Sequence, residues 1–118
     1  MKVLIVDDNP KIRRFIRSII QTQVADVDNI IECDKGMDAI EIYDQIIPDW
    51  VFMDIAMQPM NGFETSQNIF QNHPDAKIVF VTQYDEYAYR EEAKKIGARA
   101  FILKENLLDL PGLMRSLL

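Results

Sequence analysis

Short apolar runs alternate along the chain with longer segments in which apolar residues recur at helical spacing. The runs show almost no polar alternation, as VLIV and IVFV illustrate. Uninterrupted apolar runs of this length are typical of parallel strands that are buried on both faces. We therefore predict strands over residues 3–6, 30–33, 51–53, 78–81 and 100–103.

The segments between these runs have the period of amphipathic helices. The first begins at Pro10, and its apolar face is predicted to carry Ile12, Phe15, Ile16, Ile19 and Ile20. Further helices are predicted over residues 36–46, 62–72 and 87–96, the last stopped by Gly97. A final helix is predicted from Asp109 as N-cap, with Pro111 in its first turn, to the end of the sequence at Leu118.

Strands that alternate with helices predict right-handed crossovers and a parallel sheet covered on both faces. The fold class is therefore doubly wound α/β. A length of 118 residues suits one hydrophobic core, and no repeat, linker or low-complexity tract divides the chain, so a single domain over residues 1–118 is expected. In open sheets of this kind, ligands bind outside the carboxyl ends of the strands.

Composition narrows the classes of function. A net charge of −6 provides no basic field, so the domain itself is not expected to bind nucleic acid or anionic membranes. Cys33 stands alone, which excludes an intramolecular disulfide, and no signal peptide or membrane span is apparent, so we expect a cytoplasmic protein. Cys33 and the single His73 form no zinc-type cluster, and His73 is expected to be structural.

Polar residues gather at the predicted carboxyl ends of the strands. They are Asp7, Asp8, Asp54, Thr82 and Lys104. Each alone is explained by a cap, a turn or a solvated side chain. Together they predict a site at one sheet edge, because three carboxylates brought close repel one another and a cation is the simplest compensation. Oxygen ligands of this density suit Mg²⁺.

This combination of groups suits phosphoryl transfer, in which catalysis is mostly positioning and neutralisation of charge. Asp54 is the best candidate nucleophile, because it ends a central strand and would form an acyl phosphate. Asp7 and Asp8 would hold Mg²⁺, Lys104 would pair with one phosphoryl oxygen, and Thr82 would donate a hydrogen bond to another. No general base is required, since a carboxylate is ionised near neutral pH.

Four stretches carry a resemblance to a known family. They are VDD at residues 6–8, DIAMQPMNG from Asp54, VTQYDE from Val81 and FILK ending at Lys104. In their order and over essentially the whole chain, they resemble the receiver domains of two-component response regulators. The resemblance implies a flavodoxin-like sheet of strand order 2-1-3-4-5. It also implies that Asp54 accepts a phosphoryl group from a phosphohistidine on a sensor histidine kinase or phosphotransfer protein.

The same resemblance assigns further roles. Asp7, Asp8, Asp54 and the backbone carbonyl of Ala56 would form the Mg²⁺ site, and Thr82 and Lys104 would report phosphorylation. Phe101 takes the place of the family's switch aromatic; without a hydroxyl it can signal only by packing, and a plain core role is equally open.

Ala56 and Tyr84 are predicted to lengthen the life of the phosphorylated state. The methyl group of Ala56 cannot orient a hydrolytic water, and Tyr84 would shield the acyl phosphate. A plain exposed aromatic in a loop is the equally supported alternative for Tyr84.

The sequence departs from the family at two places. Gln58 separates Met57 from Pro59, whereas the family usually has proline directly after the methionine. Glu105 follows Lys104, where the family commonly has a proline, often in a cis peptide. Both changes leave the proposed chemical groups in place but put the conformation of the two loops in question.

Two rival functions are disfavoured. Aspartyl-phosphate phosphatases and transferases usually carry an acid two residues after the nucleophile, together with a cap domain, whereas Ala56 occupies that position and no cap domain is present. A binding module without phosphorylation is disfavoured by the intact Asp8, Asp54, Thr82 and Lys104.

The sequence leaves alternatives open for the partners of the domain. Arg13, Arg14 and Arg17 offer either a docking face for a kinase helix or a solvated helix face, the second being slightly favoured. TQYDE and LKEN resemble receivers of transcription factors with a C-terminal helix-turn-helix domain, so both a stand-alone receiver and a fragment lacking its DNA-binding domain fit. The resemblance also suggests homodimerisation.

Overall fold

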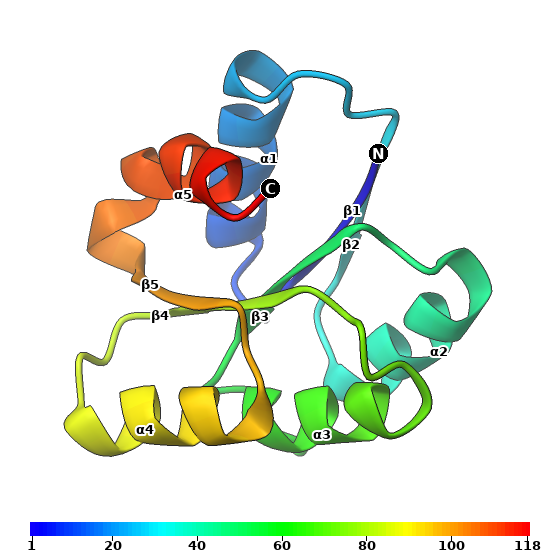
Figure 1. Cartoon of the computed structure of the whole chain (residues 1–118), viewed down its shortest axis with the longest axis vertical. Helices are drawn as coiled ribbons and strands as arrows, with labels where there is room; N and C mark the ends of the chain where they lie inside the picture. The colour runs from blue at the N-terminus through cyan, green and yellow to red at the C-terminus, as the bar shows by residue number, and fades with distance from the viewer.

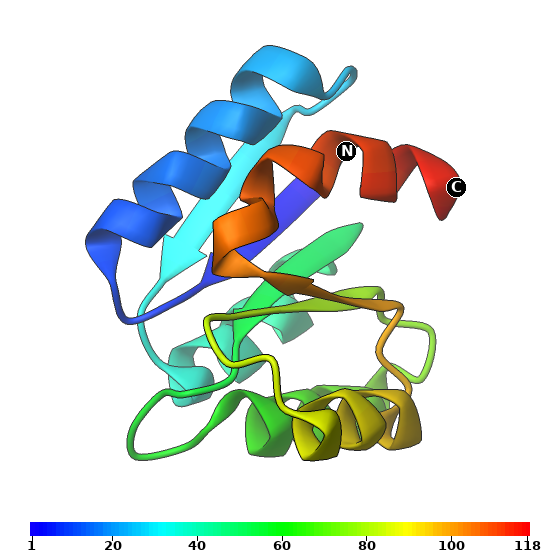
Figure 2. The ribbon, with the colours of Figure 1, turned by 90° about the vertical axis from the view of Figure 1, so that its left-hand side faces the viewer.

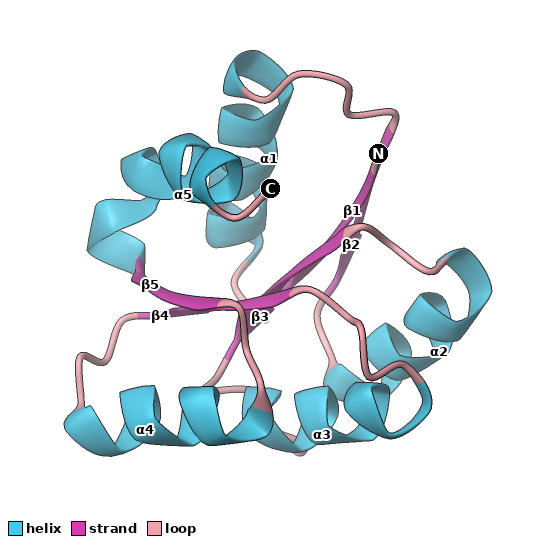
Figure 3. Cartoon of the chain, in the orientation of Figure 1, coloured by secondary structure: helices cyan, strands magenta, loops and turns pink.

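The apolar runs form one parallel sheet, whose strand order is β2-β1-β3-β4-β5 in a computed structural model that describes residues 1–118. This confirms the predicted doubly wound, flavodoxin-like fold (Figure 3). Each strand extends the predicted run by at most one residue at either end. The strands are β1 (Lys2–Val6), β2 (Asn29–Cys33), β3 (Trp50–Asp54), β4 (Ile78–Thr82) and β5 (Ala100–Leu103).

Helices cover both faces of the sheet. They are α1 (Pro10–Gln23), α2 (Gly36–Ile46), α3 (Gly62–Asn72), α4 (Tyr87–Ile96) and α5 (Leu110–Ser116). Figures 1 and 2 show α1 and α5 on one face and the other three helices on the opposite face. None of these helices combines the length and the apolar character needed to cross a lipid bilayer.

Side chains of the sheet alternate between two hydrophobic clusters, because successive strand residues point to opposite faces. On β1, Val3 and Ile5 join the cluster under α1 and α5, whereas Leu4 and Val6 join the cluster under α2, α3 and α4. Each cluster contains 13 buried residues. Burial on both sides explains why the strands lack polar alternation.

Helix α1 follows the prediction with one exception. The side chain of Asn9 accepts a hydrogen bond from the backbone nitrogen of Lys11 and so caps the helix that Pro10 begins. Ile16, Ile19 and Ile20 are buried as predicted. The prediction for Phe15 was wrong, since 44% of this residue is exposed. At 3.6 residues per turn, Phe15 lies roughly 90° around the axis from the centre of the buried stripe.

The C-terminal segment differs more from the prediction. A 3-10 helix, Lys104–Asp109, begins directly after β5 and leads into α5. Asp109 adopts helical backbone angles and makes no side-chain capping bond, so its predicted capping role was wrong. Pro111 lies in the first turn as expected, but α5 ends at Ser116 and Leu118 is exposed.

The two loops that depart from the family pattern are defined in the structure. Glu105 lies within the 3-10 helix, and the peptide after Lys104 is not cis. The cis peptide of the chain joins Gln58 to Pro59, in the loop between β3 and α3.

Helix α3 begins in direct contact with the backbone of β3. Asn61 and Glu64 form a capping box at its first turn. A Cβ atom on Gly62 would lie only 2.1 Å from the carbonyl oxygen of Asp54. Glycine at this position therefore permits the close approach of α3 to the end of β3.

Replacing this glycine should destabilise the protein. We expect Gly62→Ala to lower the free energy of unfolding by about 3 kcal/mol, because the added methyl group meets backbone that cannot move aside. Gly112→Ala is the matched control within α5, since its Cβ would meet only the end of Arg115 at 3.8 Å. The control should gain about 0.5–1 kcal/mol from helix propensity. Urea unfolding of both variants provides the measurement, and equal stabilities would contradict the close approach.

Candidate functional site

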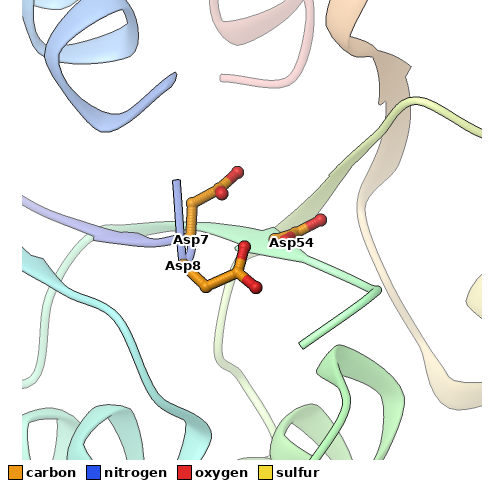
Figure 4. A group of neighbouring side chains, drawn as sticks. All are labelled: Asp7, Asp8 and Asp54. Atoms are coloured by element: carbon orange, nitrogen blue, oxygen red, sulfur yellow. The ribbon is translucent and has the colours of Figure 1, made fainter. Parts of the chain in front are cut away.

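The carboxyl ends of three strands bring four charged side chains together. Asp7 follows β1, Asp54 ends β3 and Lys104 follows β5. One carboxylate oxygen from each of Asp7, Asp8 and Asp54 lies within 4.8 Å of the others (Figure 4). Asp7 and Asp54 are only 1% and 3% exposed, whereas Asp8 is exposed. The predicted acidic cluster therefore forms, at the sheet edge where it was expected.

Lys104 lies between the two buried carboxylates. Its Nζ is 3.0 Å from Asp7 Oδ2 and 3.5 Å from Asp54 Oδ1. Apart from this contact with Lys104, the buried Asp7 Oδ2 has no polar partner. One ammonium group therefore offsets three carboxylates only in part.

Burial and mutual repulsion raise the pKa values of both buried acids. Burial is the main cause of the rise in the pKa of Asp54 to about 6, and the neighbouring Asp7 adds to it, while Lys104 opposes it. The pKa of Asp7 is also raised, mainly by burial, and is lowered in part by the Asn9 backbone and by Lys104. At pH 7 Asp54 is thus still mostly ionised, as its proposed role as nucleophile requires.

The donor set fits a divalent cation such as Mg²⁺. All three acids offer oxygen ligands, two of them are desolvated, and the one cation present leaves net negative charge at the site. A metal ion would remove the repulsion that raises the pKa values of the two buried acids. The residues present therefore suit the group that the sequence predicted.

Three hydrogen bonds hold Asp7, two at its backbone and one at its side chain. Its nitrogen donates to the Cys33 carbonyl at 3.2 Å, its Oδ1 accepts from the Asn9 nitrogen at 2.9 Å, and its carbonyl oxygen accepts from Arg13 Nη1 at 2.7 Å. The contact from Arg13 was not foreseen. The loop between β1 and α1 thus presents the acid pair in a fixed conformation.

The basic face predicted on α1 is largely absent. Arg13 and Arg17 are half-buried, and both pair with Glu32 of β2. Only Arg14 of the three is exposed. The helical period gave no signal for this arrangement, because Glu32 is far from both arginines in the sequence.

The loop after β3 carries Ala56. The carbonyl oxygen of Ile55 accepts hydrogen bonds from the backbone nitrogens of Met57 and Gly62, at 3.0 and 2.8 Å. These bonds turn the chain directly after Asp54 and leave Ala56 exposed beside it.

Thr82 is fully buried at the end of β4, next to β3 in the sheet. Its hydroxyl oxygen accepts a hydrogen bond from the Tyr84 backbone nitrogen at 3.2 Å, and the structure records no bond from Thr82 to the acids. Tyr84 is 40% exposed, and its ring meets Tyr89 of α4 edge to face at 6.2 Å. Tyr84 is therefore a partly packed residue of the loop that follows β4.

Phe101 lies half-buried on β5. The Arg90 guanidinium carbon is 4.6 Å from the centre of its ring, and Arg90 Nε also donates to Asp85 Oδ1 at 2.6 Å. This contact, which no sequence pattern indicated, connects Phe101 with the loop that follows Thr82. Phe101 thus packs partly against the hydrophobic core and partly against Arg90.

His73 and Cys33 lie outside the acidic cluster. His73 Nε2 lies 2.7 Å from Asp44 Oδ1, and its ring is 4.7 Å from that of Tyr43, in agreement with the expected structural role. Burial raises the pKa of the Cys33 thiol to about 11, so this cysteine is a weak nucleophile.

Comparison with known families decides the identity of the fold. The sequence model of the response regulator receiver domain matches residues 3–112. The chain belongs to the response regulator receiver family. The predicted resemblance is thereby confirmed, and the chain carries a receiver domain of a two-component signalling system.

Characterised receivers show the same relationship. The chain is 34% identical to the chemotaxis protein CheY of Listeria monocytogenes over 104 residues, which cover 88% of this chain and 86% of that protein. It is 38% identical to the response regulator VraR of Staphylococcus saprophyticus over 106 residues, covering 88% of this chain and 49% of that protein. It thus spans about half the length of the VraR relative.

Solved structures agree. A DNA-binding response regulator of the LuxR family from Staphylococcus aureus superposes with a TM-score of 0.89 at 26% identity, covering 98% of this chain and 97% of that chain. The receiver fold is therefore shared along nearly the full chain.

The raised pKa of Asp54 predicts how stability depends on pH without metal. A carboxyl group whose pKa is higher in the folded state than in the unfolded state loses stability as pH rises from about 4 to about 6. We expect Asp54→Asn to remove this loss, and to exceed wild type at pH 7.5 by about 2 kcal/mol. Urea unfolding in EDTA at pH 4.5 and 7.5 measures the difference.

The exposed Asp75→Asn is the control, because its carboxyl group lies apart from the acidic cluster. It should show the pH dependence of the wild type. A stability gain of Asp54→Asn that is the same at both pH values would contradict a raised pKa.

Proposed function

We propose that this receiver is a phosphorylation-dependent switch, in which Asp54 accepts a phosphoryl group from a phosphohistidine of a sensor histidine kinase or phosphotransfer protein. One observation carries the proposal: a buried carboxylate ends a central strand and is flanked by two further acids and one lysine. Such an arrangement supplies a nucleophile, a cation site and a phosphate partner at one sheet edge.

The reaction needs few protein groups. A carboxylate oxygen of Asp54 attacks the phosphorus atom, the new O–P bond forms, and the P–N bond breaks with its electron pair returning to the imidazole nitrogen. Mg²⁺, held by Asp7, Asp8, Asp54 and the carbonyl of Ala56, would supply neutralisation of the phosphoryl oxygens. The domain catalyses only its own phosphorylation and dephosphorylation, so it acts as a phosphoacceptor and not as an enzyme on a separate substrate.

Lys104 and Thr82 would respond to the phosphoryl group. The ammonium group already lies within 3.5 Å of Asp54 and can pair with a phosphoryl oxygen instead. The Thr82 hydroxyl accepts from Tyr84 and keeps its own hydrogen for a second phosphoryl oxygen. A movement of Thr82 would pull on the loop that leads to Asp85, and through Arg90 would reach Phe101. Phe101 would thus signal by packing.

Phosphorylation would act on the cell through the partners that the domain binds. Homodimerisation or docking of a target is supported by the membership in a signalling family. Because the domain carries a net negative charge, it is not itself expected to bind DNA. The matched LuxR-family regulator is described as DNA-binding, which supports a separate C-terminal DNA-binding domain as one form of the whole protein. A single free cysteine suits the reducing cytoplasm, where we place the protein.

Phosphorylation is tested by intact mass. In Mg²⁺ and acetyl phosphate, wild type should gain one phosphoryl group and Asp54→Ala none. The control Asp75→Ala removes an exposed carboxylate outside the cluster and should be modified like wild type. Chromatography of the same samples reports a change in size. A folded wild type that gains no mass and shows no response to beryllofluoride would contradict the proposal.

Tyr84 is proposed to shield the acyl phosphate from water. We expect Tyr84→Ala to shorten the half-life of the phosphorylated protein several-fold, because water gains access to the rim of the site. Tyr87→Ala is the control, since Tyr87 is 78% exposed on α4. Decay of the phosphorylated mass after removal of acetyl phosphate gives the half-life. An unchanged half-life in Tyr84→Ala would leave Tyr84 as a plain loop aromatic.

A further inference from the structure

A network of two arginines and one glutamate lies between β2 and the acid pair. Glu32 of β2 accepts at Oε1 from Arg13 Nε, at 3.1 Å, and at Oε2 from Arg17 Nε, at 2.6 Å. Each arginine also donates to a backbone carbonyl. Arg17 Nη2 donates to Ile30 O at 2.8 Å, and Arg13 Nη1 donates to Asp7 O at 2.7 Å.

The last of these bonds acts on the acidic site. Asp7 O belongs to the peptide that joins Asp7 to Asp8, so a fixed donor at this oxygen fixes the plane from which both side chains project. Two further bonds hold Asp7. Its nitrogen donates to Cys33 O of the neighbouring strand β2, and its Oδ1 accepts from Asn9 N in the loop before α1. Arg13 supplies the only donor in this set that belongs to a side chain.

We propose that Arg13, held by Glu32 and Arg17, is a positioning residue for the Mg²⁺ site. Its hydrogen bond to Asp7 O keeps the peptide between Asp7 and Asp8 oriented so that both carboxylates stay beside Asp54. This inference rests on the proposed function, because it assumes that the acid cluster binds Mg²⁺. It adds three residues outside the cluster to the machinery that prepares the site.

The effect is one of geometry more than of charge. Arg13 shares the carboxylate of Glu32 with Arg17. The pKa values of Asp7 and Asp54 are raised mainly by burial and lowered by Lys104, and Arg13 is not among the causes of either shift. What the site requires is the planar fork of a guanidinium, which reaches Glu32 with Nε and Asp7 O with Nη1 at once. A lysine keeps the charge and the pair with Glu32 but has no rigid fork.

The requirement for a fork gives the test. Calorimetric titration with MgCl₂ at pH 7.5 compares wild type with Arg13→Lys, Arg13→Met and the controls Arg14→Lys and Arg14→Met. Loss of a partner that orients a metal ligand typically weakens binding about 10-fold or more, so both Arg13 variants should show a Kd at least about 10-fold higher. Arg14 is exposed and takes no part in this network, so its variants should bind like wild type.

A second readout separates positioning from general stability. The backbone amide of Asp8 belongs to the peptide that Arg13 holds. Its NMR signal in metal-free protein should move in Arg13→Lys and stay in Arg14→Lys. Because the lysine variant keeps the ion pair with Glu32, its unfolding midpoint should remain near that of wild type. Weak Mg²⁺ binding at normal stability is not expected from a purely structural ion pair.

A double variant tests whether Glu32 acts through Arg13. Glu32→Gln alone should weaken Mg²⁺ binding, because the arginine loses its charged partner. Combined with Arg13→Lys it should weaken binding no further than Arg13→Lys alone, since the two changes remove one and the same contact. Additive effects would show that Glu32 does not act through Arg13 and would overturn this part of the proposal.

The outcomes distinguish this inference from the proposed function. Wild-type Mg²⁺ affinity together with an unmoved Asp8 signal in Arg13→Lys would overturn the positioning role and leave the proposed function intact. Absence of Mg²⁺ binding in folded wild type would overturn both. If Arg13→Met does not fold, Arg13→Lys decides the matter, because it retains the charge.

Discussion

Repulsion between buried carboxylates is the constraint on which this receiver depends. Asp7 and Asp54 are almost fully enclosed, Asp8 stands beside them, and Lys104 is the single cation within ion-pair distance. Such a cluster costs folding energy, which the surrounding structure must supply. Two fully packed hydrophobic layers, the close seat of α3 on β3 and the hydrogen bonds around Asp7 hold it together. A bound divalent cation would relieve this repulsion.

Most of the fold could be predicted because its signals are local. A strand buried on both faces must be apolar throughout. The runs that begin at Val3 and Ile78 can therefore be identified as strands from their own residues, without knowledge of the strands beside them. The site was predictable for a topological reason. In a parallel sheet all carboxyl ends meet at one edge, and polar residues such as Asp54 and Lys104 at the ends of the runs therefore had to lie near one another.

What escaped prediction depends on contacts between distant parts of the chain. Arg13 looked like a residue of a solvated helix face, because its partner Glu32 lies on another element. The contact of Arg90 with Phe101 follows no periodicity. Aspartate is a common N-cap residue, but the 3-10 helix before Asp109 already leads the chain into α5, and Asp109 makes no capping hydrogen bond. Composition and spacing describe single elements, whereas these contacts arise from how elements meet.

The sheet also divides the molecule into two compartments. Side chains under α1 and α5 form one hydrophobic cluster, and those under α2, α3 and α4 form another, with the strands between them. Phe101 packs against the second cluster, as does Tyr89 of α4. Repacking around α4 can therefore proceed while the opposite layer keeps its interior unchanged. A substitution in one layer can thus be accommodated by its own neighbours, without rearrangement of the interior on the other side of the sheet.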